Sequence, residues 1–302
     1  MKIFDRKNYK RYLDPKLISQ LKGLDFIARM VVEGFLVGLH RSPYHGFSVE
    51  FAEHREYIPG DELRYVDWKL YGRTDRYYVK VFEEETNLKT YLIIDKSGSM
   101  GFHSNGISKL EYVKYLASAL SFLLLRQKDA IGLLLFSKEL DSYIPPSSRR
   151  NHLNLLLNEL NLLTPGGETS LSSVLFNLAE KIKRRGLIVI FSDLFDDYDS
   201  VVRSLKIFRH KKNEVLVFHI LDPAEVLFPY RKDMLFKDME TNERLNIDAK
   251  VVRTSYREKI KRLINAYKKD FRNASIDYQF LRTDTPYDTA LFSYLKKRKR
   301  MK

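Results

Sequence analysis

The second half of the chain alternates short apolar runs with longer segments in which apolar residues recur every three or four positions. The short runs are typical of buried strands and the longer pattern of amphipathic helices. The expected strands are 90–95, 130–136, 140–143, 187–193, 214–220 and 276–281, and the expected helices are 109–127, 149–160, 170–185, 200–211, 255–272 and 287–299. This alternation predicts an α/β fold with a doubly wound, mostly parallel six-stranded sheet. The strand at 140–143 follows its predecessor so closely that we expect it to pair antiparallel, at the sheet edge.

Two different patterns precede this region. Asp14-Pro15 resembles a helix N-cap followed by proline at the first helical position, and it predicts a helix from Pro15 to about Val37. The following stretch has short strand-like runs and no long helical pattern. We therefore expect an N-terminal helical segment over 1–46, a small β-rich module over 47–88 and an α/β domain over 89–302.

Residues 222–275 interrupt the alternation of the α/β domain and are expected to be an insertion. Within them, the short runs 235–238 and 245–248 flank Thr241-Asn242, a pattern that predicts a β-hairpin. We expect this hairpin to pack against the β-rich module.

The composition limits the class of protein. The chain has 302 residues, of which 44% are hydrophobic and 30% charged, as expected of a globular protein. The absence of cysteine excludes disulfides, thiolate zinc sites and cysteine nucleophiles. The N-terminal residues contain no apolar signal-peptide region, and no apolar run is long enough to cross a bilayer. The expectation is a soluble, cytoplasmic protein.

The formal net charge is +14, and part of the excess lies in a basic run at 296–302. Such a run can contact nucleic acid or an anionic membrane surface. It can equally be the solvated, frayed end of a helix. Nucleic-acid binding through the basic surface therefore stays open as an alternative function.

Three separated segments carry oxygen ligands. Asp95, Ser97 and Ser99 follow one apolar strand, Thr169 lies on a Gly-Gly loop, and Asp193 ends a second apolar strand. Because ligands of open α/β sheets bind beyond the carboxyl ends of the strands, we expect these side chains to meet. Two crowded carboxylates would repel each other, and a divalent cation such as Mg²⁺, with Mn²⁺ as an alternative, would relieve that repulsion. The alternative is that these residues are separate helix caps.

These five residues match, in order and spacing, a motif known from other proteins. Asp95-x-Ser97-x-Ser99, Thr169 and Asp193 resemble the metal-ion-dependent adhesion site (MIDAS) of von Willebrand factor A-type domains. The resemblance implies a sheet ordered 3-2-1-4-5-6 and a Mg²⁺ ion held directly or through water. It also implies that an Asp or Glu from a partner protein completes the coordination of the ion.

A second signature lies in the N-terminal half, at 46–51, 55–69 and 83–85. It resembles a bacterial domain-of-unknown-function family, number 58, whose members are called MoxR-associated proteins with a von Willebrand factor A-like domain. The resemblance implies a MoxR-type AAA+ ATPase as partner and a role in assembling or activating other proteins.

Charged residues of both signs stand beside aromatic residues in this signature. They form either a recognition surface for a partner or a network of internal salt bridges, and Trp68 is expected to be a core residue. The residues in question are Arg55, Tyr57, Asp61, Arg64, Asp67, Trp68 and Arg73.

The motifs favour a metal-dependent adaptor that binds a client protein, not an enzyme. The chain has no Gly-Lys-Ser or Gly-Lys-Thr phosphate loop and no Gly-x-Ser-x-Gly nucleophile elbow. One enzymatic alternative remains, a Mg²⁺-dependent hydrolase or phosphoryl-transfer enzyme that would use the same acidic cluster.

Overall fold

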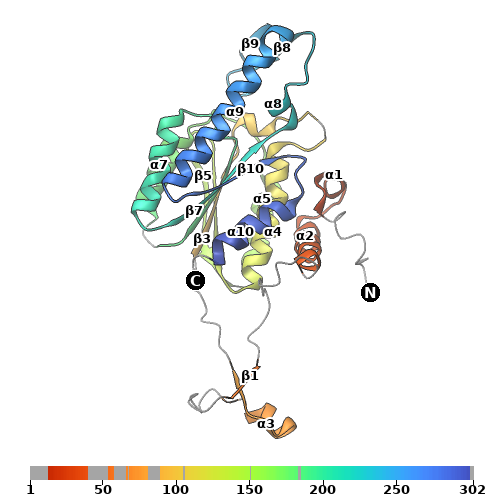
Figure 1. The fold of residues 1–302 in the computed structure, drawn as a ribbon, viewed down its shortest axis with the longest axis vertical. Coiled ribbons are helices and arrows are strands. Elements are labelled where there is room, and N and C mark those ends of the chain that lie inside the picture. Colours follow the sequence, from red (N-terminus) through yellow and green to blue (C-terminus); the bar gives the residue numbers. More distant parts are fainter. Residues whose placement is uncertain are drawn as a thin grey trace.

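A six-stranded sheet runs through the main body of the molecule, with helices on both of its faces (Figure 1). The structure is a computed structural model. It describes residues 13–39, 54–57, 66, 68–80, 89–104, 106–149, 151–182 and 185–299.

The strands follow the order β10-β7-β6-β3-β4-β5. Their bounds are β3 (Lys89–Asp95), β4 (Ala130–Phe136), β5 (Leu140–Ser147), β6 (Leu187–Ser192), β7 (Glu214–Leu221) and β10 (Asp277–Arg282). All neighbours are parallel except β4 and β5, which pair antiparallel at the edge. If the six strands are numbered along the chain with β3 as the first, the order read from β5 to β10 is 3-2-1-4-5-6. The predicted fold class, the strand order and the antiparallel edge strand are all confirmed.

The central strands are buried on both faces, which explains why they appear in the sequence as continuous apolar runs. Successive side chains face opposite layers, so Ile94 joins one core and Ile93 the other. The first core includes residues of α2 (Leu24–Leu39), α4 (Lys109–Arg126), α5 (His152–Leu162) and α10 (Tyr287–Lys299). The second includes residues of α6 (Leu171–Lys181), α7 (Tyr198–His210) and α9 (Ala249–Asn273).

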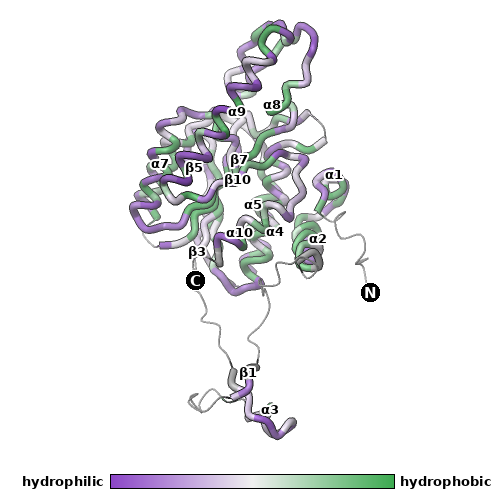
Figure 2. Tube along the Cα trace, viewed as in Figure 1, coloured by the Kyte–Doolittle hydropathy of each residue, from purple (hydrophilic) through white to green (hydrophobic). Residues whose placement is uncertain are grey.

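The N-terminal helix differs from the prediction. Asp14 does cap it, accepting a hydrogen bond from the Lys16 backbone N–H at 2.9 Å, but α1 spans only Pro15–Ile18. The chain turns through Gly23, whose φ of +89° favours glycine, before α2 begins. The single helix expected over 15–37 is therefore wrong. The trace of α2 is largely hydrophobic (Figure 2), and this helix packs against α4 and α10.

The insertion forms α8 (Pro223–Leu227), the hairpin β8 (Asp233–Lys237) and β9 (Arg244–Asp248), and all of α9. The hairpin was predicted and is present. Its expected packing against the β-rich module is wrong for the described part of that module, which lies with β1 and α3 at the opposite end of the molecule (Figure 1). The 25-residue α9 spans about 38 Å at 1.5 Å per residue, and it holds the hairpin beyond the carboxyl edge of the sheet.

The described part of the β-rich module contains β1 (His54–Glu56), antiparallel to β2 (Tyr78–Lys80), and a short helix, α3 (Trp68–Thr74), that was not predicted. Trp68 is 58% exposed and meets the ring of Tyr71 edge-on, so its expected place in a core is wrong. The rings of Tyr71 and Tyr77 stack with centroids 4.5 Å apart.

The basic C-terminal run begins inside the folded domain. Lys297 is 6% exposed, and its Nζ lies 2.7 Å from Asp277 Oδ2 and also contacts Glu214. The expectation of a solvated helix end is therefore wrong at this residue. No helix in the described part of the chain is both long and apolar enough to cross a bilayer.

Candidate metal centre

The first loop of the site leaves β3 at its carboxyl end. Asp95 is almost fully buried there, and its Oδ1 accepts a hydrogen bond from the Ser97 backbone N–H at 2.9 Å. This contact turns the chain into the short 3-10 helix η3 (Gly98–Gly101). The hydroxyl oxygens of Ser97 and Ser99 lie 3.1 Å apart. One carboxylate and two hydroxyls thus project from a single turn.

The second loop lies directly beside the first. The Gly98 N–H donates to the Gly167 carbonyl at 2.9 Å, and the Gly166 N–H donates to the Lys96 carbonyl at 2.8 Å. Gly167 has a φ of +83°, a conformation that glycine adopts without strain. The side-chain oxygen of Thr169 is buried and has no hydrogen-bond partner among the described residues. A buried hydroxyl normally has a hydrogen-bond partner, so the oxygen of Thr169 is available to coordinate a metal ion.

The third segment follows β6. The Ser192 hydroxyl donates to Asp95 Oδ2 at 2.7 Å, which places Asp193 next to the first loop. Asp193 is fully buried, and its Oδ1 accepts from the Phe195 N–H at 3.3 Å. Burial acts to raise the pKa of Asp193, whereas Lys109 and, to a smaller extent, Ser99 act to lower it. The structure therefore brings the three predicted segments together at the carboxyl ends of the central strands. They carry Asp95, Ser97, Ser99, Thr169 and Asp193.

The two carboxylates differ in their electrostatics. Burial, and then the charge of Asp193, raise the pKa of Asp95 to about 7. Burial acts in the same direction on Asp193, but the charge and hydrogen bond of Lys109 outweigh it and hold the pKa of Asp193 below its usual value. Asp193 therefore has a nearby positive charge, whereas Asp95 remains a buried carboxyl that resists ionisation.

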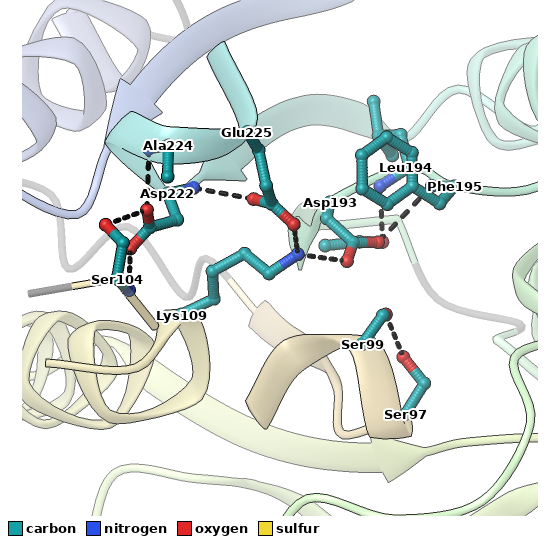
Figure 3. A network of polar contacts seen from close by, with 11 residues as sticks. Ser97, Ser99, Ser104, Lys109, Asp193, Leu194, Phe195, Asp222, Ala224 and Glu225 are labelled. Carbon is teal, nitrogen blue, oxygen red and sulfur yellow. Dashed lines mark hydrogen bonds and ion pairs between the residues drawn. The ribbon is translucent and has the colours of Figure 1, made fainter. Parts of the chain in front are cut away.

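Lys109 is the site residue that the sequence analysis missed. Its Nζ lies 2.7 Å from Asp193 Oδ2 and 2.6 Å from Glu225 Oε1, and the side chain is fully buried (Figure 3). Burial acts to lower the pKa of Lys109, but the two carboxylates outweigh it and raise that pKa. A signal was present in the sequence, because Lys109 directly follows the N-cap Ser108 and a lysine opposes the dipole of a helix N-terminus.

The same network reaches the base of the insertion. Asp222 and Glu225 form a capping box at the start of α8, with the Asp222 N–H donating to Glu225 Oε2 at 2.7 Å. The Ser104 N–H, from the loop after η3, donates to Asp222 Oδ2 at 3.0 Å (Figure 3). The turn between β8 and β9 also reaches the site, since the Thr169 N–H donates to Glu240 Oε2 at 2.8 Å. None of these three acids, Asp222, Glu225 and Glu240, was singled out in the sequence.

The described residues of the N-terminal signature lie apart from this site, at the end of the molecule that carries β1 and α3 (Figure 1). Tyr57 meets Tyr77 with ring centroids 6.2 Å apart, and Arg73 is exposed on α3. Arg55 pairs through its backbone with Val79 in the β1–β2 ladder. Three residues of the predicted set lie outside the described residues: Asp61, Arg64 and Asp67.

The donor set suits a hard cation. Two carboxylates and three hydroxyls supply only oxygen, the element that Mg²⁺ prefers in proteins. In the described ranges no three His, Asp or Glu side chains cluster as a metal site of another kind would require. A bound divalent ion would stabilise the ionised form of Asp95 and would give a partner to the Thr169 hydroxyl, which has none in the described part of the chain.

Comparisons with known proteins agree with this architecture. Residues 53–267 match the family described as "Protein of unknown function DUF58". A relative, "Uncharacterized protein Rv1480" of Mycobacterium tuberculosis H37Rv, is 29% identical over 231 residues, which is 76% of this chain and 72% of the relative.

One solved structure supports the fold. An aerotolerance-related membrane protein from Bacteroides fragilis superposes with a TM-score of 0.50 at 17% identity, over 71% of this chain and all of the other. The "SpRpn10 VWA domain" aligns with a TM-score of 0.41 at 14% identity, over 68% and 93% of the two chains. The sheet has the strand order expected of a von Willebrand factor A-like fold. The matched sequence covers well over half of the chain, so this protein belongs to the DUF58 family.

Proposed function

We propose that this protein is a metal-dependent protein-interaction module, not an enzyme. The chain would hold Mg²⁺, or Mn²⁺ in its place, and a client protein would bind the ion with an Asp or Glu. The observation that carries the proposal is the buried Thr169 hydroxyl, unpaired within the described part of the chain, on a loop bonded to the one with Asp95, Ser97 and Ser99. These residues and Asp193 would be the ligands.

The charges around the site favour a cation. Lys109 neutralises part of the charge on Asp193 and Glu225, but no Lys or Arg in the described ranges pairs with Asp95, and burial raises the pKa of Asp95 to about 7. A divalent ion would supply the missing positive charge, and its preference for oxygen would orient the incoming client carboxylate.

The proposed partner in the cell is a MoxR-type AAA+ ATPase, with which the protein would act as an adaptor in the assembly or activation of client proteins. Membership of the DUF58 family supports this proposal. The exposed aromatic and basic side chains Trp68 and Arg73 on α3, far from the sheet edge, leave a second surface for such a partner.

Calorimetric titration with MgCl₂ and MnCl₂ tests the metal site. Wild type should bind one ion, and Asp95→Asn should lose binding, because it removes a charged ligand at nearly constant size. Asp199→Asn is the matched control, since Asp199 is exposed in the first turn of α7, and it should bind like wild type. Undiminished binding in Asp95→Asn would overturn the proposal. Client capture from a lysate of the native cell should then disappear in chelator.

A further inference from the structure

We propose that Glu240, at the tip of the β8–β9 hairpin, is an internal carboxylate that takes the place of the client's acid at this site. The insertion would thereby keep the site closed until the hairpin tip is displaced. This inference rests on the proposed function and concerns how access to that site is controlled.

The first observation is a direct contact. Oε2 of Glu240 accepts a hydrogen bond from the Thr169 backbone N–H at 2.8 Å, and Glu240 is partly buried there. Thr169 is also the residue whose hydroxyl oxygen is buried and, in the ranges described, lacks a partner. A carboxylate from 71 positions further along the chain thus reaches the loop that supplies a proposed ligand.

The second observation is the close approach of the two backbones. A Cβ added to Gly98 would lie 2.5 Å from the carbonyl oxygen of Met239, and one added to Gly101 would lie 3.5 Å from the Met239 methyl carbon. Real Cβ atoms do not approach an oxygen so closely, so the hairpin tip fits against η3 only because Gly98 has no side chain. The tip therefore covers the first loop as well as the second.

The third observation is that the turn is built to present Glu240. Oδ1 of Asp238 accepts hydrogen bonds from the N–H groups of Glu240 at 2.7 Å and Thr241 at 2.8 Å. The Asp238 N–H in turn donates to the Glu243 carbonyl at 2.8 Å, and Asn242 takes a φ of +63°. These contacts fix the backbone around Glu240 independently of the site.

The hairpin is held on α9 through the aromatic contacts of one residue, Phe236, and its other strand residues have little cover. Phe228 stacks on Phe236 with ring centroids 5.7 Å apart and packs on Tyr256 of α9. Leu235, which precedes Phe236 in β8, and Leu245, which pairs with Phe236 from β9, are each 62% exposed. A two-stranded hairpin with so little burial is marginally stable, so the tip can leave the site without disturbing the sheet.

An internal carboxylate would outcompete most free acids. A group tethered to the site acts at an effective concentration on the order of millimolar, so an external carboxylate must bind well to displace it. The insertion would therefore exclude weakly binding acids and admit a client that also engages the hairpin.

The test compares Glu240→Ala with Glu243→Ala, a control that removes the same charge from an exposed position in the same turn. Hydrogen exchange of the Thr169 amide is measured in metal-free protein, and Mn²⁺ affinity is measured by titration. In Glu240→Ala we expect the Thr169 amide to exchange at least about tenfold faster, because its acceptor is lost. We also expect Mn²⁺ to bind about tenfold more weakly, because a nearby negative charge is lost. Glu243→Ala should match wild type in both.

The outcomes separate the two proposals. If wild type binds Mn²⁺ and Glu240→Ala binds it equally well, Glu240 is not an internal ligand, and this inference fails while the proposed metal site stands. Faster amide exchange with unchanged affinity would overturn it in the same way, since Glu240 would then be only a structural acceptor. If wild type and both variants all fail to bind Mn²⁺, the proposed function itself fails.

Discussion

The ammonium group of Lys109 lies 2.7 Å from the carboxylate of Asp193, and both side chains are fully buried. It also lies 2.6 Å from Glu225, so one lysine joins a proposed metal ligand to the base of the insertion. Removing one partner of a buried ion pair leaves the other charge without compensation. We therefore expect Lys109→Met to lower the free energy of unfolding by about 3 to 5 kcal/mol in chelator. Urea unfolding measures the loss.

Added metal distinguishes this charge effect from a packing defect. A divalent ion would compensate Asp193 in place of the lost ammonium, so millimolar Mg²⁺ should stabilise Lys109→Met more than it stabilises wild type. Lys250→Met, which changes an exposed lysine in the first turn of α9, should unfold like wild type. An equal response to Mg²⁺ in wild type and Lys109→Met would contradict the explanation.

Asp95 should make the metal-free protein less stable as the pH rises. Burial raises the pKa of this carboxyl to about 7 in the folded state, above its value of 3.8 when exposed. The folded state therefore favours the protonated form, and the stability it contributes at low pH is lost between about pH 4 and 7. At pH 8 in chelator, Asp95→Asn should be more stable than wild type by about 1 to 3 kcal/mol.

Thermal or urea unfolding of both proteins in chelator, from pH 5 to 8, measures this difference. The two curves should converge toward pH 5, where Asp95 is protonated in the folded wild-type protein. Excess Mg²⁺ at pH 8 should reverse the order, since only wild type keeps the charged ligand. An Asp95→Asn protein that is less stable than wild type at every pH would rule out a buried, uncompensated charge.

Much of the fold was predictable because the central strands carry their own signal. β3, β4 and β6 are buried on both faces, so each is an uninterrupted apolar run whose ends were located to within one residue or so. The break between α1 and α2 was missed for the opposite reason. Apolar residues continue through Leu21 and Leu24 at helical spacing, and only the positive φ of Gly23 reveals the turn.

The site was predictable where its residues follow strands, and not where they come from the insertion. Asp95 and Asp193 lie at carboxyl ends of parallel strands, which must share one edge of the sheet. Glu240 reaches the same place only because the tip of the β8–β9 hairpin turns back over η3. The position of Glu240 depends on packing between segments that are distant in the sequence, and no local sequence pattern predicts such packing.

His219, on β7, should make the protein more stable at neutral than at acidic pH. Its ring is fully buried among Tyr267, Tyr278 and Phe280, and burial lowers the pKa of the imidazole from 6.5 to about 4. The unfolded chain gains a proton first as the pH falls, so stability is lost from about pH 6.5 down to pH 4. Between pH 7.5 and 5 the loss should be about 2 kcal/mol.

The variant His219→Phe separates the effect of His219 titration on stability from the effects of the other titratable groups. The variant keeps an aromatic ring in an aromatic environment but has nothing to titrate. The difference in unfolding free energy between wild type and variant should therefore narrow as the pH falls from 7.5 to 5. A difference that stays constant with pH would show that the imidazole keeps its ordinary pKa when folded.

The lack of a side chain at Gly98 should be required for the hairpin tip to pack on the first loop. The Cβ of Gly98→Ala would lie 2.5 Å from the Met239 carbonyl oxygen, a backbone atom that can retreat only if the turn moves. We expect the turn at 238–243 to leave η3 and to become about tenfold more sensitive to limited proteolysis, because a detached turn opens locally at little cost. Gly166→Ala is the control on the neighbouring loop, since a Cβ there meets nothing within 4 Å in the described structure. If both variants are cleaved at the wild-type rate, the hairpin does not rest on the site in solution, and the close approach of Met239 to Gly98 has no part in its control.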